Sequence, residues 1–202
     1  GVDMGRPMEV NTVHQCSNGG FRIKGHGETT IPGLYGIGEA ATGYHGADRL
    51  GGHMMACSQV FGLRAGLHAA AAAKKSGPPS VKDDVAKAAL ERIESMRKSK
   101  GGVKPAETTR RLAQIAWEDL LAVRSDASIK RVLKEVERIR AEDMPKLGIE
   151  TASDLTQALE LQNLLLNAEL VSRAALMRTE SRGSHYREDF PETDQQNWAK
   201  AI

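Results

Sequence analysis

The sequence predicts an α+β protein with three parts: a small glycine-rich α/β part over residues 1–77, a C-terminal helical bundle over residues 78–184 and an extended tail over residues 185–202. Residues 1–77 hold most of the 20 glycines and five of the six histidines. Residues 80–180 are rich in Glu, Lys, Arg, Leu and Ala and contain little Gly or Pro, which is typical of packed helices. Aromatic residues make up only 4% of the chain, too few for a large aromatic β core. The first part is therefore expected to carry a functional site, and the second to serve as its scaffold.

Short extended segments separated by turns are expected in the glycine-rich part. Residues 18–20 (Asn-Gly-Gly) are a turn signal, and the alternating residues 21–23 that follow predict a strand. Residues 34–38 predict a short buried strand, whose two glycines indicate that another group approaches the backbone closely. Residues 39–50 are polar and contain further glycines, which predicts a loop.

A long helix is expected from about His53, because apolar residues recur there at three- and four-residue steps. Two basic residues, Lys74 and Lys75, suit the C-terminal end of its dipole, and residues 77–79 (Gly-Pro-Pro) stop it.

Four helices are expected in the bundle. They are predicted from Ser80 to about residue 101, from Pro105 to about residue 123, from Ser128 to before Pro145, and from Thr151 or Ser153 to Gly183. Trp117 is expected in the bundle core, with its indole N–H hydrogen-bonded. The polar tail that follows is expected either to lie on a neighbouring part or to be frayed.

Composition and charge exclude several functional classes. The 202 residues allow one domain or one and a half, and the net charge of +2 gives no indication of nucleic acid or an anionic membrane as a partner. No apolar run approaches the roughly 20 residues that span a bilayer, so no direct membrane insertion is expected, and no export signal is recognised. The two cysteines form neither a disulfide framework nor a Cys-x-x-Cys pair, which favours a reducing, cytoplasmic location.

One stretch combines residues suited to binding a cofactor. Glu39 follows the expected strand 34–38, and a carboxylate at such a strand end can accept hydrogen bonds from sugar hydroxyls. The glycine pair 51–52 precedes the helix expected from His53, whose first-turn N–H groups favour anionic charge. Arg49 lies directly before this turn and has the planar fork that binds a carboxylate. The same pattern also fits an ordinary glycine-rich loop, so spacing alone leaves both readings open.

Several ordered motifs resemble one known family. The run GLYGIGEAATGYHGADRLGG over residues 33–52 resembles the C-terminal flavin-binding segment of the succinate dehydrogenase/fumarate reductase flavoprotein family, which includes L-aspartate oxidase. Residues 7–21 (PMEVNTVHQCSNGGF) resemble the family segment that places a histidine before a Gly-Gly turn. Residues 117–128, 159–163 and 178–187 resemble motifs of the family's helical domain and its closing signature, although a glycine of the first motif is absent.

The resemblance implies an FAD-dependent oxidoreductase in which hydride moves between flavin N5 and a small dicarboxylate. His14 and Arg49 match family residues that bind substrate carboxylates, so both are expected to be catalytic. Glu39 matches the glutamate that holds the ribose or ribityl part of FAD. The residues expected to bind the cofactor are Gly38, Glu39, Ala40, Gly52, His53, Met54 and Met55, and no metal site is expected. His45 is expected either to shape the loop or to reach the substrate.

Some of the family pattern is altered or absent. Residues 53–55 (His-Met-Met) stand where Asn-Ser-Leu is usual, and Asp48 replaces Asn, which adds a negative charge beside Arg49. The glycine-rich turn for the FAD pyrophosphate and the capping domain are not found in the sequence. The resemblance therefore implies that residues 1–77 are the C-terminal part of an FAD-binding domain, completed by an N-terminal FAD-binding and capping portion.

The partners implied by the resemblance are that N-terminal portion, the dicarboxylate and an iron–sulfur electron-transfer subunit. A partner would place the protein peripherally at the inner face of the cytoplasmic membrane. Residues 178–187, which are rich in arginine, are expected either to dock the iron–sulfur partner or to hold the tail against the flavin domain. An alternative from another functional class stays open, namely a non-catalytic helical assembly module or partner-docking fragment derived from the family. A flavin-containing preparation favours the oxidoreductase, and a colourless one favours the module.

Overall fold

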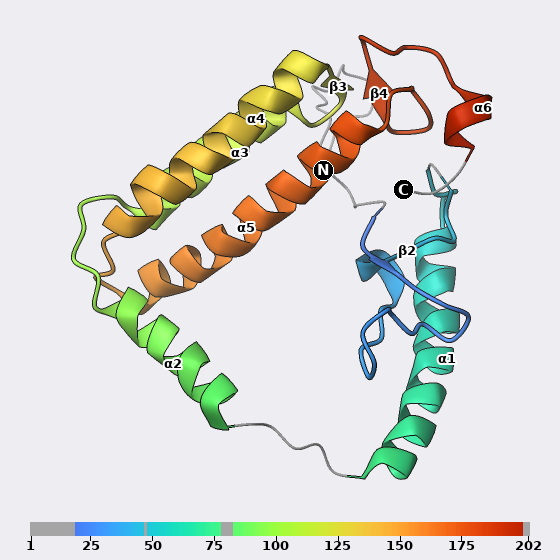
Figure 1. Ribbon diagram of the computed structural model, residues 1–202, viewed down its shortest axis with the longest axis horizontal. Helices are drawn as coiled ribbons and strands as arrows, with labels where there is room; N and C mark the ends of the chain where they lie inside the picture. The colour runs from blue at the N-terminus through green and yellow to red at the C-terminus, as the bar shows by residue number, and fades with distance from the viewer. Residues whose placement is uncertain (1–18, 47, 78–82, 200–202) are drawn as a thin grey trace, which may run out of the picture. The chain divides into compact units, whose positions relative to one another are not determined.

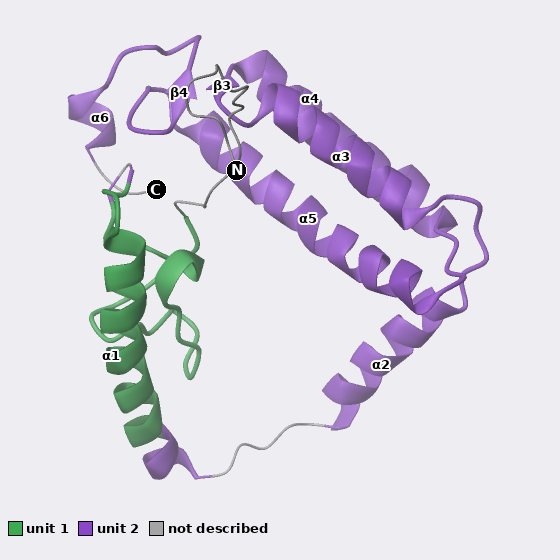
Figure 2. Ribbon diagram, turned by 180° about the vertical axis from the view of Figure 1, so that it is seen from behind, with its two compact units in different colours: residues 1–45, 49–72 green, residues 46–48, 73–202 purple. Residues whose placement is uncertain are grey.

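The computed structural model describes residues 19–46, 48–77 and 83–199 (Figure 1). The chain forms two compact units, shown in different colours in Figure 2: unit 1 comprises residues 1–45 and 49–72, and unit 2 comprises residues 46–48 and 73–202. The predicted α+β class, with a small glycine-rich part followed by a larger helical part, is confirmed.

Unit 1 consists of short extended segments and most of one long helix. The strand β1 (Phe21–Arg22) pairs in parallel with β2 (Ala41–Thr42), and the 3-10 helix η1 (Gly38–Ala40) leads directly into β2. Gly20 permits this pairing, because its φ is 124° and a Cβ there would lie 2.3 Å from the Ala40 carbonyl oxygen. The helix α1 (His53–Ser76) begins and ends within a residue or so of its predicted bounds.

The strand predicted over residues 34–38 is wrong. This segment makes one isolated bridge, between Glu28 and Tyr35, and Ile37 is 41% exposed. Gly33 and Gly38 adopt positive φ values of 82° and 57°, so the extended backbone is broken at both ends of the segment.

Unit 2 is built mainly from helices. Its elements are α2 (Asp83–Arg97), α3 (Pro105–Asp119), β3 (Val123–Arg124), α4 (Asp126–Arg138), the π-helical turn η2 (Ile139–Asp143), the 3-10 turn η3 (Met144–Lys146), α5 (Ala152–Met177), β4 (Tyr186–Arg187) and α6 (Gln195–Trp198). The four predicted bundle helices are thus present, although Ser80, the N-cap expected for the first, lies outside the described residues.

Helix boundaries in unit 2 follow local capping. Pro105 occupies the first turn of α3, as predicted. A capping box closes the start of α5, where Thr151 accepts from the Asp154 amide, so Thr151 rather than Ser153 is the N-cap. The predicted start of α4 at Ser128 is two residues late, because Ser128 is the N3 member of a capping box whose N-cap is Ser125.

The core of unit 2 lies where α3, α4 and α5 pack together. Its most buried apolar side chains, each at most 1% exposed, are Ile129, Val132, Val136, Ile139, Ala158, Leu161 and Leu165. The expectation that Trp117 belongs to this core is wrong, since its side chain is 45% exposed. The core-facing stripe of α3 runs through Thr108 and Leu112, and Trp117 lies about 140° around the helix from Leu112.

The described part of the tail is ordered and packs within unit 2. β4 pairs in parallel with β3, and α6 follows with Asp194 as its N-cap. Of the two arrangements expected for the tail, the structure therefore shows the packed one.

Within the described residues, no helix is both long enough and apolar enough to cross a membrane. Over the same residues there is no group of three His, Cys, Asp or Glu side chains placed to hold a metal ion. Cys57 is a free thiol, and Cys16 lies outside the described residues.

Candidate functional site

The turn η1 places three of the predicted site residues against the start of α1. Gly38 is buried, and a Cβ at this position would lie 2.7 Å from the Ser58 hydroxyl oxygen. That hydroxyl is fixed because it donates to the Met54 carbonyl at 2.8 Å. Glycine at position 38 therefore allows the turn to sit on the first turns of α1, and it leaves the neighbouring Glu39 side chain exposed.

Tyr44 fastens the following loop to this turn. Its hydroxyl donates to the Gly38 carbonyl at 2.6 Å, and its ring stacks on Phe61 of α1 with centroids 4.9 Å apart. Burial raises the pKa of the Tyr44 phenol, and an electrostatic effect of the nearby Cys57 raises it further. The phenol is therefore a protonated donor at neutral pH, and it holds the loop in one place.

His45 lies beside Tyr44, with the ring centroids 4.4 Å apart in an edge-on contact. Both imidazole nitrogens are buried, and neither has a hydrogen-bond partner in the part of the chain that the structure describes. Burial lowers the pKa of His45, and the charges of His53 and Arg49 lower it further, so the ring is neutral at neutral pH. A neutral imidazole has one donor and one acceptor, and burying them unpaired destabilises the fold.

The remaining predicted residues surround the start of α1. Arg49 is half-buried, and its charge acts on His45. Gly52, with φ 81°, immediately precedes the helix, whose first turn contains no acidic residue. His53 is exposed and Met54 is half-buried. The partial positive charge of this helix start is therefore not offset by a carboxylate of its own first turn.

The structure thus brings together one turn, one loop and one helix start from the predicted stretch. Met55, a further predicted cofactor residue, is 68% exposed in the first turn of α1. His14 lies outside the described residues, and its role stays a prediction. The sequence left the role of His45 open between shaping the loop and reaching the substrate. The available signal was a histidine between Tyr44 and Gly46, four residues before Arg49.

A second polar cluster lies elsewhere in unit 1 and was not predicted. The rings of His26 and His68 stack with centroids 5.0 Å apart, and His68 Nδ1 is 2.8 Å from the Tyr35 hydroxyl. Glu28 lies 3.6 Å from His68 Nε2. Since each of these groups has a partner in the cluster, it is accounted for by local packing.

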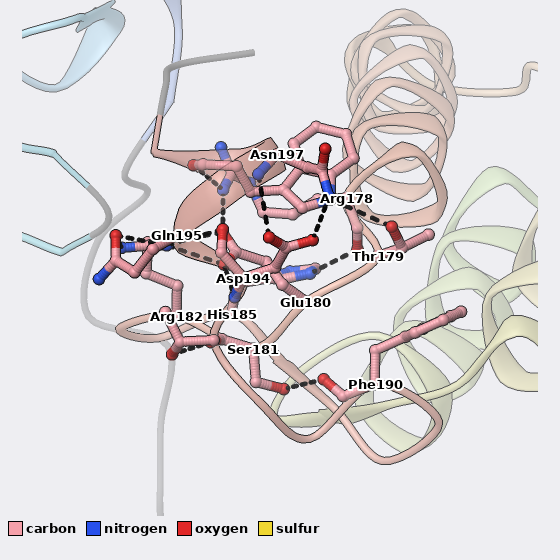
Figure 3. Close-up of polar contacts among 12 residues, drawn as sticks. Arg178, Thr179, Glu180, Ser181, Arg182, His185, Phe190, Asp194, Gln195 and Asn197 are labelled. Carbon is pink, nitrogen blue, oxygen red and sulfur yellow. Dashed lines mark hydrogen bonds and ion pairs between the residues drawn. The ribbon is translucent and has the colours of Figure 1, made fainter.

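The arginine-rich segment, residues 178–187, is occupied by contacts inside unit 2 (Figure 3). Glu180 is fully buried; it pairs with Arg178, accepts from Arg182 Nε and Nη2 at 2.8 and 2.9 Å, and accepts from the Asp194 amide at 2.8 Å. The Arg178 guanidinium also lies 5.2 Å from the Trp198 ring centroid. These contacts bring residues 178–182 and the region around Asp194 together at the Glu180 carboxylate.

Arg187 is the second buried anchor of the tail. It is 1% exposed, donates to both carboxylate oxygens of Asp189 at 2.7 Å, and donates to the Ala175 carbonyl at 2.7 Å. The Arg187 guanidinium lowers the pKa of Asp189 to about 2. These arginines therefore have structural roles within unit 2, which weakens the expectation that they dock a partner.

Comparisons with known proteins match both parts of the chain. The family described as "Fumarate reductase flavoprotein C-term" matches residues 109–202, and the family described as "FAD binding domain" matches residues 4–55.

The relatives with matching sequence are much longer than this chain. A fumarate reductase (CoM/CoB) subunit of Methanothermobacter marburgensis is 41% identical over 100% of this chain and 37% of its own length. The fumarate reductase flavoprotein subunit of Haemophilus influenzae is 31% identical over 96% of this chain and 34% of its own length. The chain therefore spans about a third of the length of these relatives.

Solved structures agree with the sequence matches. Mycobacterium smegmatis Sdh1 in complex with UQ1 has a TM-score of 0.81 at 30% identity, covering 87% of this chain and 30% of that one. A quinol–fumarate reductase with menaquinol molecules has a TM-score of 0.79 at 30% identity, covering 88% of this chain and 32% of that one.

Proposed function

Since this chain belongs to the fumarate reductase/succinate dehydrogenase flavoprotein family, we propose that it is the C-terminal part of an FAD-dependent oxidoreductase that acts on a small dicarboxylate. The observation that most supports this function is the grouping in unit 1 of Arg49, the neutral His45 with its buried nitrogens, and a helix start without acidic residues. Such a grouping is suited to binding anions beside a cofactor.

The residues of unit 1 fit FAD. Glu39 is exposed in η1, which leads into β2, and a carboxylate at such a position can accept hydrogen bonds from ribose or ribityl hydroxyls. Bound FAD would supply hydride transfer at its N5 atom. The backbone of Gly38 and Ala40 would line the cofactor, together with first-turn amides at the start of α1. Those amides belong to Gly52, His53, Met54 and Met55. Because amides rather than side chains bind there, methionine is compatible with the role.

Arg49 would bind one carboxylate of the substrate and draw electron density from the adjacent carbon–carbon bond. A guanidinium suits this role because it stays charged and forms two parallel hydrogen bonds to a carboxylate. We assign the second carboxylate to His14 on the strength of the family resemblance. Asp48, next to Arg49 in sequence, adds a negative charge that weakens the attraction of this site for a dianion. We therefore expect a lower substrate affinity than in relatives with Asn at this position.

The proposed partners follow from the same assignment. An N-terminal FAD-binding and capping portion would complete the site and supply the proton, and an iron–sulfur subunit would exchange electrons with the flavin. Membrane association, where it occurs, would run through such a partner at the inner face of the cytoplasmic membrane. The relatives' names describe them as subunits, which supports assembly of this kind.

Substitution of Arg49 tests the proposed function in the flavin-loaded flavoprotein. We expect Arg49→Ala to lower fumarate reduction or succinate oxidation by about 10²- to 10³-fold while flavin stays bound. Arg64→Ala is the matched control, because Arg64 is an exposed arginine of the same unit. Turnover of Arg49→Ala near that of the control would refute the assignment. A protein that never takes up FAD would instead support the non-catalytic assembly module.

A further inference from the structure

His45 combines features that a purely structural histidine would not need. Its ring is packed edge-on against Tyr44, yet both ring nitrogens are buried without a partner in the described part of the chain. In native proteins, buried polar groups left unpaired are uncommon, and those that persist usually meet a ligand, an ion or water. The loop position itself is already secured by the Tyr44 hydroxyl bond to Gly38.

The groups around His45 indicate which kind of ligand would pair with its unpartnered ring nitrogens. The charged groups that act on it are Arg49, from the loop, and His53, from the start of α1. A guanidinium has donors only, so Arg49 cannot accept the His45 N–H. The Tyr44 hydroxyl is directed to Gly38. The partner that the N–H lacks is therefore an acceptor, and the positive charge of Arg49 favours an anionic oxygen there.

We propose that the His45 imidazole donates a hydrogen bond to a carboxylate oxygen of the dicarboxylate that Arg49 binds. This inference rests on the proposed function, and it makes His45 a substrate-binding residue in addition to His14 and Arg49. A neutral histidine beside an arginine contributes a directed hydrogen bond without repelling the guanidinium.

Binding of a dianion has a further consequence at His45. The incoming negative charge offsets the effects of Arg49 and His53, so the affinity of the imidazole for a proton rises in the complex. The flavoprotein should therefore take up protons when a dicarboxylate binds near neutral pH. A histidine that only shapes the loop would show no such uptake.

Malonate is the probe, because it is a dicarboxylate that lacks the carbon–carbon bond to be oxidised. Its Kd is measured on the flavin-loaded flavoprotein by calorimetry in two buffers of different ionisation enthalpy, which also gives the proton uptake. We expect His45→Gln to weaken malonate binding by about tenfold or more, to abolish the uptake and to retain flavin. The control is His26→Gln, the same change at an exposed histidine of unit 1.

Each outcome decides the question. Equal malonate Kd values and equal proton uptake in His45→Gln and His26→Gln would overturn the inference. A weakened affinity for FAD with unchanged malonate binding would also overturn it, and would pair His45 with the cofactor instead. If Arg49→Ala loses malonate binding while His45→Gln does not, only the role of His45 fails; if neither loses it, the proposed function fails as well. Should His45→Gln not fold, the wild-type measurement alone decides, since absence of proton uptake refutes the inference.

Discussion

Replacing Glu180 by glutamine tests whether one buried carboxylate holds the tail against the rest of unit 2. The substitution keeps the size of the side chain and removes its charge. It leaves Arg178 and Arg182 without their common anionic partner and weakens the acceptor for the Asp194 amide. We therefore expect the tail, with Trp198 at its end, to detach more readily from the helices.

The size of the effect follows from the pKa of the carboxyl group. Hydrogen bonds from Arg182, followed by the Asp194 amide and Arg178, lower the pKa of Glu180 from 4.5 to about 2. Because a tenfold change in proton affinity corresponds to about 1.4 kcal/mol, this lowering corresponds to about 3 kcal/mol. The two arginines are 15% and 22% exposed, so water screens part of the interaction, and we expect a loss of about 2–3 kcal/mol at pH 7.

Urea unfolding followed by tryptophan fluorescence measures this loss. In a Trp117→Phe background, Trp198 is the single tryptophan and reports on the tail, since its ring stacks on the Arg178 guanidinium at 5.2 Å. Glu188→Gln is the matched control, because Glu188 is an exposed carboxylate of the same segment. The difference in unfolding free energy between the two variants at pH 7 is the quantity to compare with the expected 2–3 kcal/mol.

The pH dependence gives a second, independent check. A carboxyl group whose pKa is lower in the folded state stabilises the fold above the pKa of its unfolded state, and this stabilisation is lost as the pH falls through the folded value. The gap between Glu180→Gln and wild type should therefore be full above about pH 5 and less than half as large at about pH 3. Variants at positions 180 and 188 that unfold at the same urea concentration, or a gap that does not depend on pH, would refute the reasoning.

Three further predictions concern other contacts. Burial lowers the pKa of His185, whose Nδ1 accepts a hydrogen bond from Arg124. The stability of the tail, followed by amide hydrogen exchange, should therefore be full above about pH 6.5 and fall below it. A His185→Gln protein with the same pH profile would contradict this. Gly38→Ala should destabilise unit 1 by about 1–2 kcal/mol in thermal unfolding, and adding Ser58→Ala should restore only the part due to the close contact, because the positive φ remains. Thr151→Ala should cost about 1 kcal/mol in urea unfolding by removing the N-cap of α5, whereas the exposed, non-capping Thr156→Ala should cost less than half of that.

The helical elements could be predicted from the sequence because their signals are local. Apolar periodicity and basic residues placed α1, and Pro105 marked the first turn of α3. The exposure of Trp117 could not be read in the same way, since residue type alone does not say which side of a helix faces the core. Helix α3 turns Thr108 and Leu112 inward, and this depends on its packing against α4 and α5.

The candidate site could be predicted in part. The motif over residues 33–52 pointed to Arg49 and Glu39 by sequence alone, but their roles remain proposals. The strand expected at 34–38 failed because positive φ values at Gly33 and Gly38 override an apolar pattern. The unpaired nitrogens of His45 could not be foreseen, because pairing depends on what the fold brings within hydrogen-bond distance.

The parallel pairing of β3 with β4 affects the order in which unit 2 assembles. It joins segments far apart in sequence, and the contact between Arg124 and His185 spans 61 positions. Closing so long a loop is entropically costly, whereas helical turns and helix hairpins form from near neighbours within microseconds. The three-helix core should therefore form first, and the tail should close over it last. Contacts made that late leave the folding rate nearly unchanged and instead slow unfolding, so the tail sets the lifetime of the folded unit more than the speed at which it forms.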